Sequence, residues 1–197
     1  MYSPHMGGDM KTVSLFCLLS MFLVLGCSKE GSSEERRSKD MKIESPVFVH
    51  YGEIPTRYTC EGQDISPPLT WSGLPEGTKS LALIVDDPDA PDPSAPKMTW
   101  VHWVLYNIPP NTQGLKEGIK PEELPSGTLQ GKNDWGRTGY GGPCPPIGRH
   151  RYFFKLYALD TVLEDLKTPD KAKLEKAMQG HILAKAEIIG TYQKKGR

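Results

Sequence analysis

From Pro46 onward, short apolar segments alternate with Pro and Gly at the spacing of an all-β domain, and this punctuation constrains the fold most. The 197 residues include 20 Gly and 18 Pro, yet 37% are hydrophobic, which is enough for one folded core. The expected strands are Phe48–Tyr51, Leu69–Ser72, Ser80–Asp86, Val101–Asn107, Arg151–Leu159 and Leu183–Ile189. A mainly β domain is therefore predicted.

Two segments indicate how such strands pack. The run Leu81–Val85 is apolar on both faces, which suits the centre of a sheet that is covered on both sides, as in a sandwich. One helix is predicted over Pro169–Gln179, with Thr168 as its N-cap and Gly180 beyond its end. Its apolar stripe predicts that the helix packs against the sandwich.

The amino-terminal residues read as an export signal. The apolar run Val13–Val24 follows Lys11 and is shorter than the about 20 residues that a membrane-spanning helix needs. The segment Val24–Cys27 resembles the bacterial lipobox, so residues 1–26 are predicted to be a lipoprotein signal peptide and Cys27 the lipidated residue. Residues 1–9 carry no Lys or Arg, so translation can instead start at Met10. An uncleaved anchor or a non-lipidated signal is the alternative.

Beyond the signal, residues 27–42 are charged and small, which predicts a flexible lipidated tether, and residues 43–197 form the folded domain. The predicted location is the bacterial cell envelope, with the protein lipid-anchored in the outer membrane and facing the periplasm.

A net charge of zero argues against nucleic-acid binding, so any anion site must be local. A homodimer is left open.

The cysteines and the absence of known catalytic motifs limit the reactions and cofactors that are expected of this chain. With Cys17 in the signal and Cys27 lipidated, Cys60 and Cys144 remain and are predicted to form a disulfide, the alternative being two separate thiols. The sequence lacks the serine-hydrolase elbow, the zinc-protease motif, the phosphate-binding loop and the dinucleotide fingerprint. No cofactor and no metal are expected.

Polar residues at strand ends remain as candidates. His102 is expected to share a strand face with Trp100 and Val104, and His150 with Tyr152. Each has a plainer interpretation: Asp87–Pro91 as a simple turn, His102 as a core histidine and His150 as a solvated strand entrance. The segment Leu129–Arg149 is too rich in Gly and Pro for helix or strand, and its length predicts an ordered loop that forms a site.

Together these motifs resemble the phosphatidylethanolamine-binding protein family, the relatives of Raf kinase inhibitor protein, and its bacterial branch most of all. The matching segments, in family order, are Ser66–Trp71, Asp87–Pro91, Trp100–Trp103 with Asn107–Pro109, Gly141–Pro146 and His150–Tyr152. The resemblance implies a Greek-key β-sandwich with a small C-terminal helix. It also implies an anion pocket, formed by Asp87, Pro91, Trp100, His102, Gly142, Pro145, His150 and Tyr152.

The expected function is non-enzymatic binding of a small anion, such as phosphate, a phospholipid headgroup or a carboxylate. Asp87 is expected to accept a hydrogen bond from an imidazole and favour its protonation, so that the ring donates to the anion. The alternative is a hydrolase of small esters or phosphoesters that uses His102 and His150 as acid and base, although a nucleophile is missing. A metal site of Asp87, His102 and His150 is a third possibility.

Overall fold

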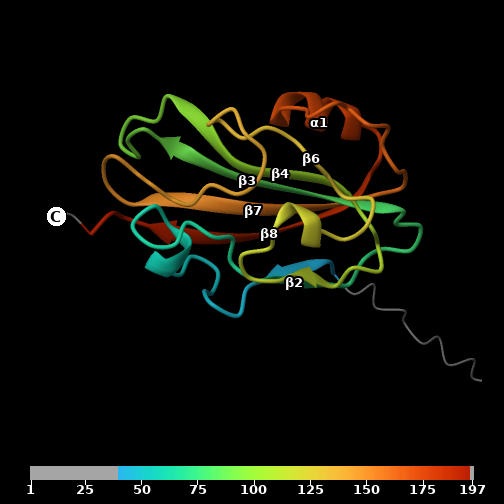
Figure 1. Ribbon diagram of the computed structural model, residues 1–197, viewed down its shortest axis with the longest axis horizontal. Coiled ribbons are helices and arrows are strands. Elements are labelled where there is room, and N and C mark those ends of the chain that lie inside the picture. Colours follow the sequence, from blue (N-terminus) through green and yellow to red (C-terminus); the bar gives the residue numbers. More distant parts are fainter. Residues whose placement is uncertain (1–39, 196–197) are drawn as a thin grey trace, which may run out of the picture. The chain divides into compact units, whose positions relative to one another are not determined.

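The computed structural model describes residues 40–195, which form a two-sheet sandwich with one small helix (Figure 1). The predicted mainly β fold is therefore confirmed. The strands are β1 Lys42–Glu44, β2 Leu69–Ser72, β3 Ser80–Ala90, β4 Met98–Ile108, β5 Gly114–Leu115, β6 Leu129–Gln130, β7 His150–Leu159 and β8 Ile182–Tyr192. The helix α1 spans Lys171–Met178, and two short 3-10 turns lie at Thr56–Tyr58 and Pro121–Glu123.

Both sheets are antiparallel, because every strand pair within them runs in opposite directions. The smaller sheet has the order β1-β2-β5 and the larger the order β6-β4-β3-β7-β8. The main core lies between them, where Trp71 and Leu115 of the small sheet meet Leu83, Phe154 and neighbouring apolar residues of the large one. In the larger sheet, the central strand β3 pairs with β4 along one edge and with β7 along the other.

A second apolar cluster covers the other face of the large sheet, where α1 packs (Figure 1). Ala82 and Ile84 of β3 point into it, and Leu174 and Met178 of α1 are buried against it. This explains why β3 is apolar on both faces. Each layer covers apolar surface that would otherwise remain in water. Burial of such surface stabilises the fold by about 25 cal/mol for each Å².

Several boundaries differ from the sequence prediction. Strands β3, β4 and β8 run further than expected, and the first two residues of Leu129–Arg149 form strand β6, although no strand was expected there. Phe48–Tyr51 is not a strand: it turns at Tyr51, whose φ is 61°, and the amide of Tyr51 donates to Ile189 at the edge of β8. The short strand β1 was not predicted, and it begins at Lys42, the last residue of the expected tether. Helix α1 begins two residues late, because the carboxylate of Asp170 caps it by accepting from the amide of Lys173, 2.8 Å away.

The predicted signal peptide and Cys27 lie outside the described residues. Within residues 40–195, no helix is both long enough and apolar enough to cross a membrane.

Candidate functional site

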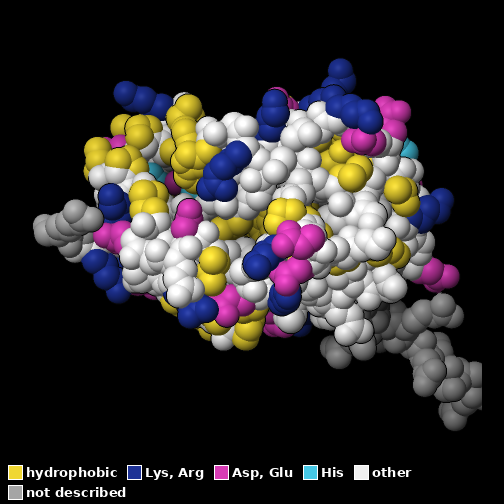
Figure 2. Space-filling model, in the orientation of Figure 1, with side chains coloured by type: hydrophobic (Ala, Val, Ile, Leu, Met, Phe, Trp, Pro, Cys, Tyr) yellow, Lys and Arg dark blue, Asp and Glu magenta, His cyan; other side chains and the backbone are white. Residues whose placement is uncertain are grey.

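A pocket of about 350 Å³ opens at one end of the large sheet, where β3 ends and β4 and β7 begin. Seven of the eight site residues implied by the family resemblance line it. The full lining is Asp87, Ala90, Pro91, Met98, Trp100, His102, Trp135, Cys144, Pro145, Pro146, His150 and Tyr152. Figure 2 shows hydrophobic side chains gathered at this end of the molecule, among Lys and Arg.

A β-bulge turns His102 into the pocket. Val85 pairs with Trp103, but the next residue, Asp86, pairs with Val101, so that His102 is an extra residue on β4. The expectation that His102 shares a strand face with Val104 is therefore wrong, because the bulge changes the alternation. Val104 lies in the cluster under α1, whereas His102 lines the pocket with Trp100.

Asp87 and His150 form a buried pair at the base of the pocket. The carboxylate Oδ2 of Asp87 lies 2.7 Å from His150 Nδ1, and the side chains are 5% and 0% exposed. The other ring nitrogen, Nε2, donates to the carbonyl of Ile147 at 2.9 Å. A carbonyl can only accept, so Nε2 carries a hydrogen and a single proton joins Nδ1 to Asp87. The pair as a whole therefore has no net charge, and His150 has no N–H left for a ligand.

Burial acts on Asp87 more strongly than its partners do. Desolvation raises the pKa of its carboxyl, although the hydrogen bonds from His150 and from the amide of Asp89 act in the opposite direction. Two residues on, Asp89 accepts from the backbone amide and from the guanidinium of Arg151 at 2.7 to 2.9 Å, and these bonds lower its pKa. Asp87–Ala90 is thus the buried end of strand β3, and the simple-turn interpretation is wrong.

His102 differs from His150 because one of its ring nitrogens is free. Nδ1 lies 2.6 Å from the carbonyl oxygen of Gly141 and must donate to it, since a carbonyl cannot donate. Within residues 40–195, Nε2 has no hydrogen-bond partner and presents a lone pair. Desolvation lowers the pKa of the ring to about 4, so the ring is neutral at neutral pH.

Tyr152 supplies the second unpartnered polar atom. Its ring lines the pocket and packs edge-on against His102, with the ring centroids 5.2 Å apart. Its hydroxyl is buried and makes no hydrogen bond to any other described residue. Desolvation raises its pKa well above the usual tyrosine value, so the hydroxyl keeps its proton. A buried hydroxyl that lacks a partner costs stability, which makes it a donor available to a ligand.

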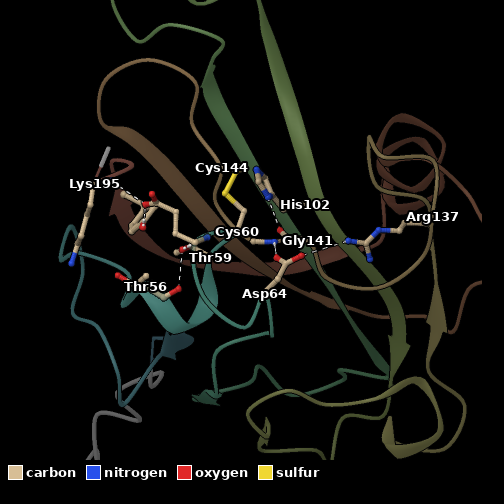
Figure 3. Close-up of a disulfide and its surroundings, with 12 residues drawn as sticks. Thr56, Thr59, Cys60, Asp64, His102, Arg137, Gly141, Cys144 and Lys195 are labelled. Carbon is tan, nitrogen blue, oxygen red and sulfur yellow. Dashed lines mark hydrogen bonds and ion pairs between the residues drawn. A yellow bond between two sulfur atoms is a disulfide. The ribbon is translucent and has the colours of Figure 1, made fainter. Parts of the chain in front are cut away.

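The glycine-rich loop is tied to the rest of the domain by a disulfide between Cys60 and Cys144 (Figure 3). The amide of Gly142 donates to Asp64 at 2.6 Å, and a side chain at this position would collide with the backbone oxygen of Tyr58. The absence of a side chain at Gly142 therefore allows the loop to lie close to the backbone of Tyr58. Gly142 is the one expected site residue that does not line the pocket.

Sequence reasoning did not place Trp135 and Met98 in the site. Trp135 packs edge-on against both Trp100 and His102, at centroid distances of 5.5 and 5.2 Å, although the loop that carries it is distant in sequence. A Cβ at Gly141 would overlap the Trp135 ring, so glycine allows the ring to lie in this position. Met98 and Trp135 are apolar lining residues that remain 54% and 43% exposed. An aromatic residue inside a glycine-rich loop was the available signal.

A larger hollow of about 440 Å³ lies between the outer strands β1 and β8. None of its lining residues carries a buried polar atom that lacks a partner in the described structure, which separates it from the pocket around His102. Nowhere in residues 40–195 do three or more His, Cys, Asp or Glu side chains form a group that could hold a metal ion. His102 and Tyr152 each bring an unpartnered polar atom to the pocket.

The fold and the site together define a β-sandwich with a largely apolar pocket at the end of its larger sheet. Residues 44–193 match the family model described as phosphatidylethanolamine-binding protein. The chain therefore belongs to the phosphatidylethanolamine-binding protein family.

Relatives and solved structures agree with this assignment. A UPF0098 protein of Methanothermobacter thermautotrophicus is 52% identical over 155 residues, which cover 78% of this chain and 99% of the relative. The crystal structure of a Chlamydia trachomatis homologue, titled a putative phosphatidylethanolamine-binding protein homologue, has a TM-score of 0.73 at 44% identity and covers 80% of this chain and 100% of its own. Escherichia coli YBCL, titled a member of the mammalian family, has a TM-score of 0.72 at 36% identity and covers 79% and 99%.

Proposed function

We propose that this protein is a non-enzymatic binding protein whose pocket holds a small acidic group, either a phosphate-type anion, free or as part of a headgroup, or a carboxylate. The observation that carries the proposal is the buried hydroxyl of Tyr152, which lacks any hydrogen-bond partner among residues 40–195. Oxygen-rich anions accept such bonds, and a bond to a charged acceptor contributes about 1.5 to 3 kcal/mol. The lone pair of His102 Nε2 provides a second point of attachment for a guest that carries an acidic proton, because this nitrogen can only accept.

The shape and walls of the pocket support a small guest. About 350 Å³ lies within the range of natural ligand sites, and such sites combine apolar walls with a few placed polar groups. Trp100, Trp135, Pro91 and Pro145 supply the walls here. Asp87 and His150 do not bond the guest in this proposal, because their polar atoms already bond one another, Ile147 and Asp89.

The hydrolase alternative lacks a nucleophile and a second histidine that is free to transfer a proton. The lining contains no Ser or Thr, and the sulfur of Cys144 is bonded to Cys60. Both nitrogens of His150 face acceptors, so that this ring cannot pass a proton to a substrate without breaking a buried bond. Binding without turnover is therefore the function that we propose.

Calorimetry on the full-length protein tests the proposal, with phosphate, phosphoethanolamine and acetate as probes. Tyr152→Phe removes only the hydroxyl, and we expect it to weaken binding by roughly tenfold to a hundredfold. Tyr157→Phe is the matched control, since Tyr157 lies on the opposite face of β7 under α1 and should leave affinity unchanged. Equal affinity in all three proteins, or no binding at millimolar probe, would reject the pocket as the binding site.

An assay against generic ester and phosphoester substrates tests the non-enzymatic part. We expect no turnover. Turnover that disappears in His102→Ala would instead establish the hydrolase.

We further propose that the domain is held in the bacterial cell envelope by lipid on Cys27, at the outer membrane and facing the periplasm. The lipobox-like segment Val24–Cys27 and the apolar run before it support this proposal. Palmitate labelling of wild type and of Cys27→Ala tests it. Absence of label on wild type, or label retained on the variant, would contradict it.

A further inference from the structure

The pocket carries no net charge before a guest enters. Its titratable lining residues are Asp87, His102, His150 and Tyr152, and none of the twelve lining residues is Lys or Arg. Asp87 and His150 form a neutral pair, and Tyr152 keeps its proton. Outside the lining, Asp86 of β3 acts on His102, and it is already paired with Lys155 and Lys171 at 2.7 and 2.6 Å. An anion would therefore enter apolar surroundings without a counter-charge, which is strongly unfavourable.

The tautomer of His102 adds a second constraint. Because Nδ1 donates to Gly141, the free Nε2 of the neutral ring can only accept. A fully ionised phosphate also has only acceptors, so its oxygens and Nε2 would face one another as lone pairs. One proton between them removes both problems, since it makes a hydrogen bond and reduces the charge of the guest.

We propose that the pocket takes up its acidic guest together with one proton, which joins a guest oxygen to Nε2 of His102, while the hydroxyl of Tyr152 donates to another oxygen. This inference rests on the proposed function and narrows its ligand class. The proton comes from the solvent, and no bond between heavier atoms forms or breaks. Because burial keeps the pKa of free His102 at about 4, the proton arrives with the guest rather than before it.

The ligand class that follows is a phosphate with an ionisable P–OH group. A phosphate monoester has a second pKa of about 6 and is easily protonated near neutral pH. A phosphodiester, as in an intact phospholipid, has no such oxygen, so the proton would have to reside on the buried imidazole. We therefore infer that the pocket prefers free phosphate or a phosphate monoester to the diester of a lipid headgroup.

Calorimetry of the full-length protein at pH 7.5, in buffers with different heats of ionisation, measures proton uptake directly. With phosphoethanolamine we expect close to one proton taken up per molecule bound, and an affinity that falls by up to tenfold for each pH unit above about 6. Glycerophosphoethanolamine, the matching diester, is expected to bind at least tenfold more weakly. Binding without proton uptake, or equal affinity for the two probes, would overturn the inference and leave the proposed function standing. If neither probe binds, both the inference and the proposed function are contradicted.

His102→Gln provides an independent arm. Its side-chain amide can donate to an ionised phosphate, so we expect binding of phosphoethanolamine with almost no proton uptake and little dependence on pH. His181→Gln is the control, because His181 is an exposed histidine that pairs with Asp160 and is not in the pocket lining, and it should behave as wild type. Uptake of a full proton by His102→Gln would contradict the assignment of the proton to Nε2. If this variant does not fold, the wild-type measurement still decides.

Discussion

The two histidines of the pocket occupy opposite kinds of environment. On the His150 side, every polar atom is paired: both ring nitrogens face acceptors, and Asp87 is bonded to His150 and to the amide of Asp89. On the His102 side, one ring nitrogen is bonded to Gly141 and the other is free, and the nearby hydroxyl of Tyr152 is free as well. The rings are buried to a similar degree, at 0% and 3% exposure. Burial alone therefore does not separate a fully paired histidine from one that is available to a ligand, whereas the number of unpaired polar atoms does.

The largest effect should come from breaking the paired side. Asp87→Ala leaves His150 buried without its partner, and removal of one member of a buried pair costs about 3 to 5 kcal/mol. We expect the free energy of unfolding, measured by urea denaturation at pH 7.5, to fall by this amount. Asp92→Ala is the control, because this exposed carboxylate bonds only to Ser94 and should cost about 1 kcal/mol or less. Similar losses in the two variants would show that the pair does not stabilise the fold.

The unpaired side should respond to pH. The pKa of His102 is about 4 in the folded protein, against about 6.5 for an unperturbed histidine. The unfolded chain therefore binds a proton first, so that stability is complete above pH 6.5 and is lost as the pH falls through 4. This contribution is about 3 kcal/mol. Urea denaturation at pH 7.5 and pH 4 should show a smaller loss for His102→Gln than for wild type, and equal losses would contradict the prediction.

The disulfide sets how firmly the loop with Gly141 is held against His102. Cys60 and Cys144 are 84 residues apart, and their bond should stabilise the domain by about 2 to 4 kcal/mol. Cys60→Ala with Cys144→Ala should lower the midpoint of urea denaturation by a corresponding amount and weaken phosphate binding. Reducing agent should destabilise wild type but leave the double variant unchanged. A response of the double variant to reducing agent would show that the disulfide is not the cause.

The smallest effect should come from Gly141→Ala. The added methyl group overlaps the ring of Trp135, and overpacking of this kind costs about 1 to 3 kcal/mol. Displacement of Trp135 should shift its fluorescence and weaken ligand binding, while the Asp87–His150 pair remains intact. Gly77→Ala is the control, since a side chain there meets no atom, although its positive φ adds a small cost. Unchanged fluorescence in Gly141→Ala would show that Trp135 does not depend on this contact.

Much of the architecture could be predicted from the sequence. The alternation of apolar segments with Pro and Gly identified five of the eight strands, and the run Leu81–Val85 indicated a sheet covered on both faces. Strands β1, β5 and β6 were missed because they are two or three residues long, which is too short for an apolar period to show. Tyr51 illustrates the opposite error, since its segment has strand composition but turns to cap the edge of β8.

The sequence by itself determined the β-sandwich and, through its family motifs, seven of the residues that line the pocket. Only the tertiary structure decided what those residues can do. The bulge at His102 depends on its register with β3, and the free nitrogen depends on a carbonyl 39 residues away in the chain. In the same way, the backbone carbonyl of Ile147 accepts a hydrogen bond from His150 Nε2, so that this nitrogen is not free. Strand patterns follow from neighbouring residues, whereas hydrogen-bond partners follow from how distant segments meet, and a carbonyl has no signature in the sequence.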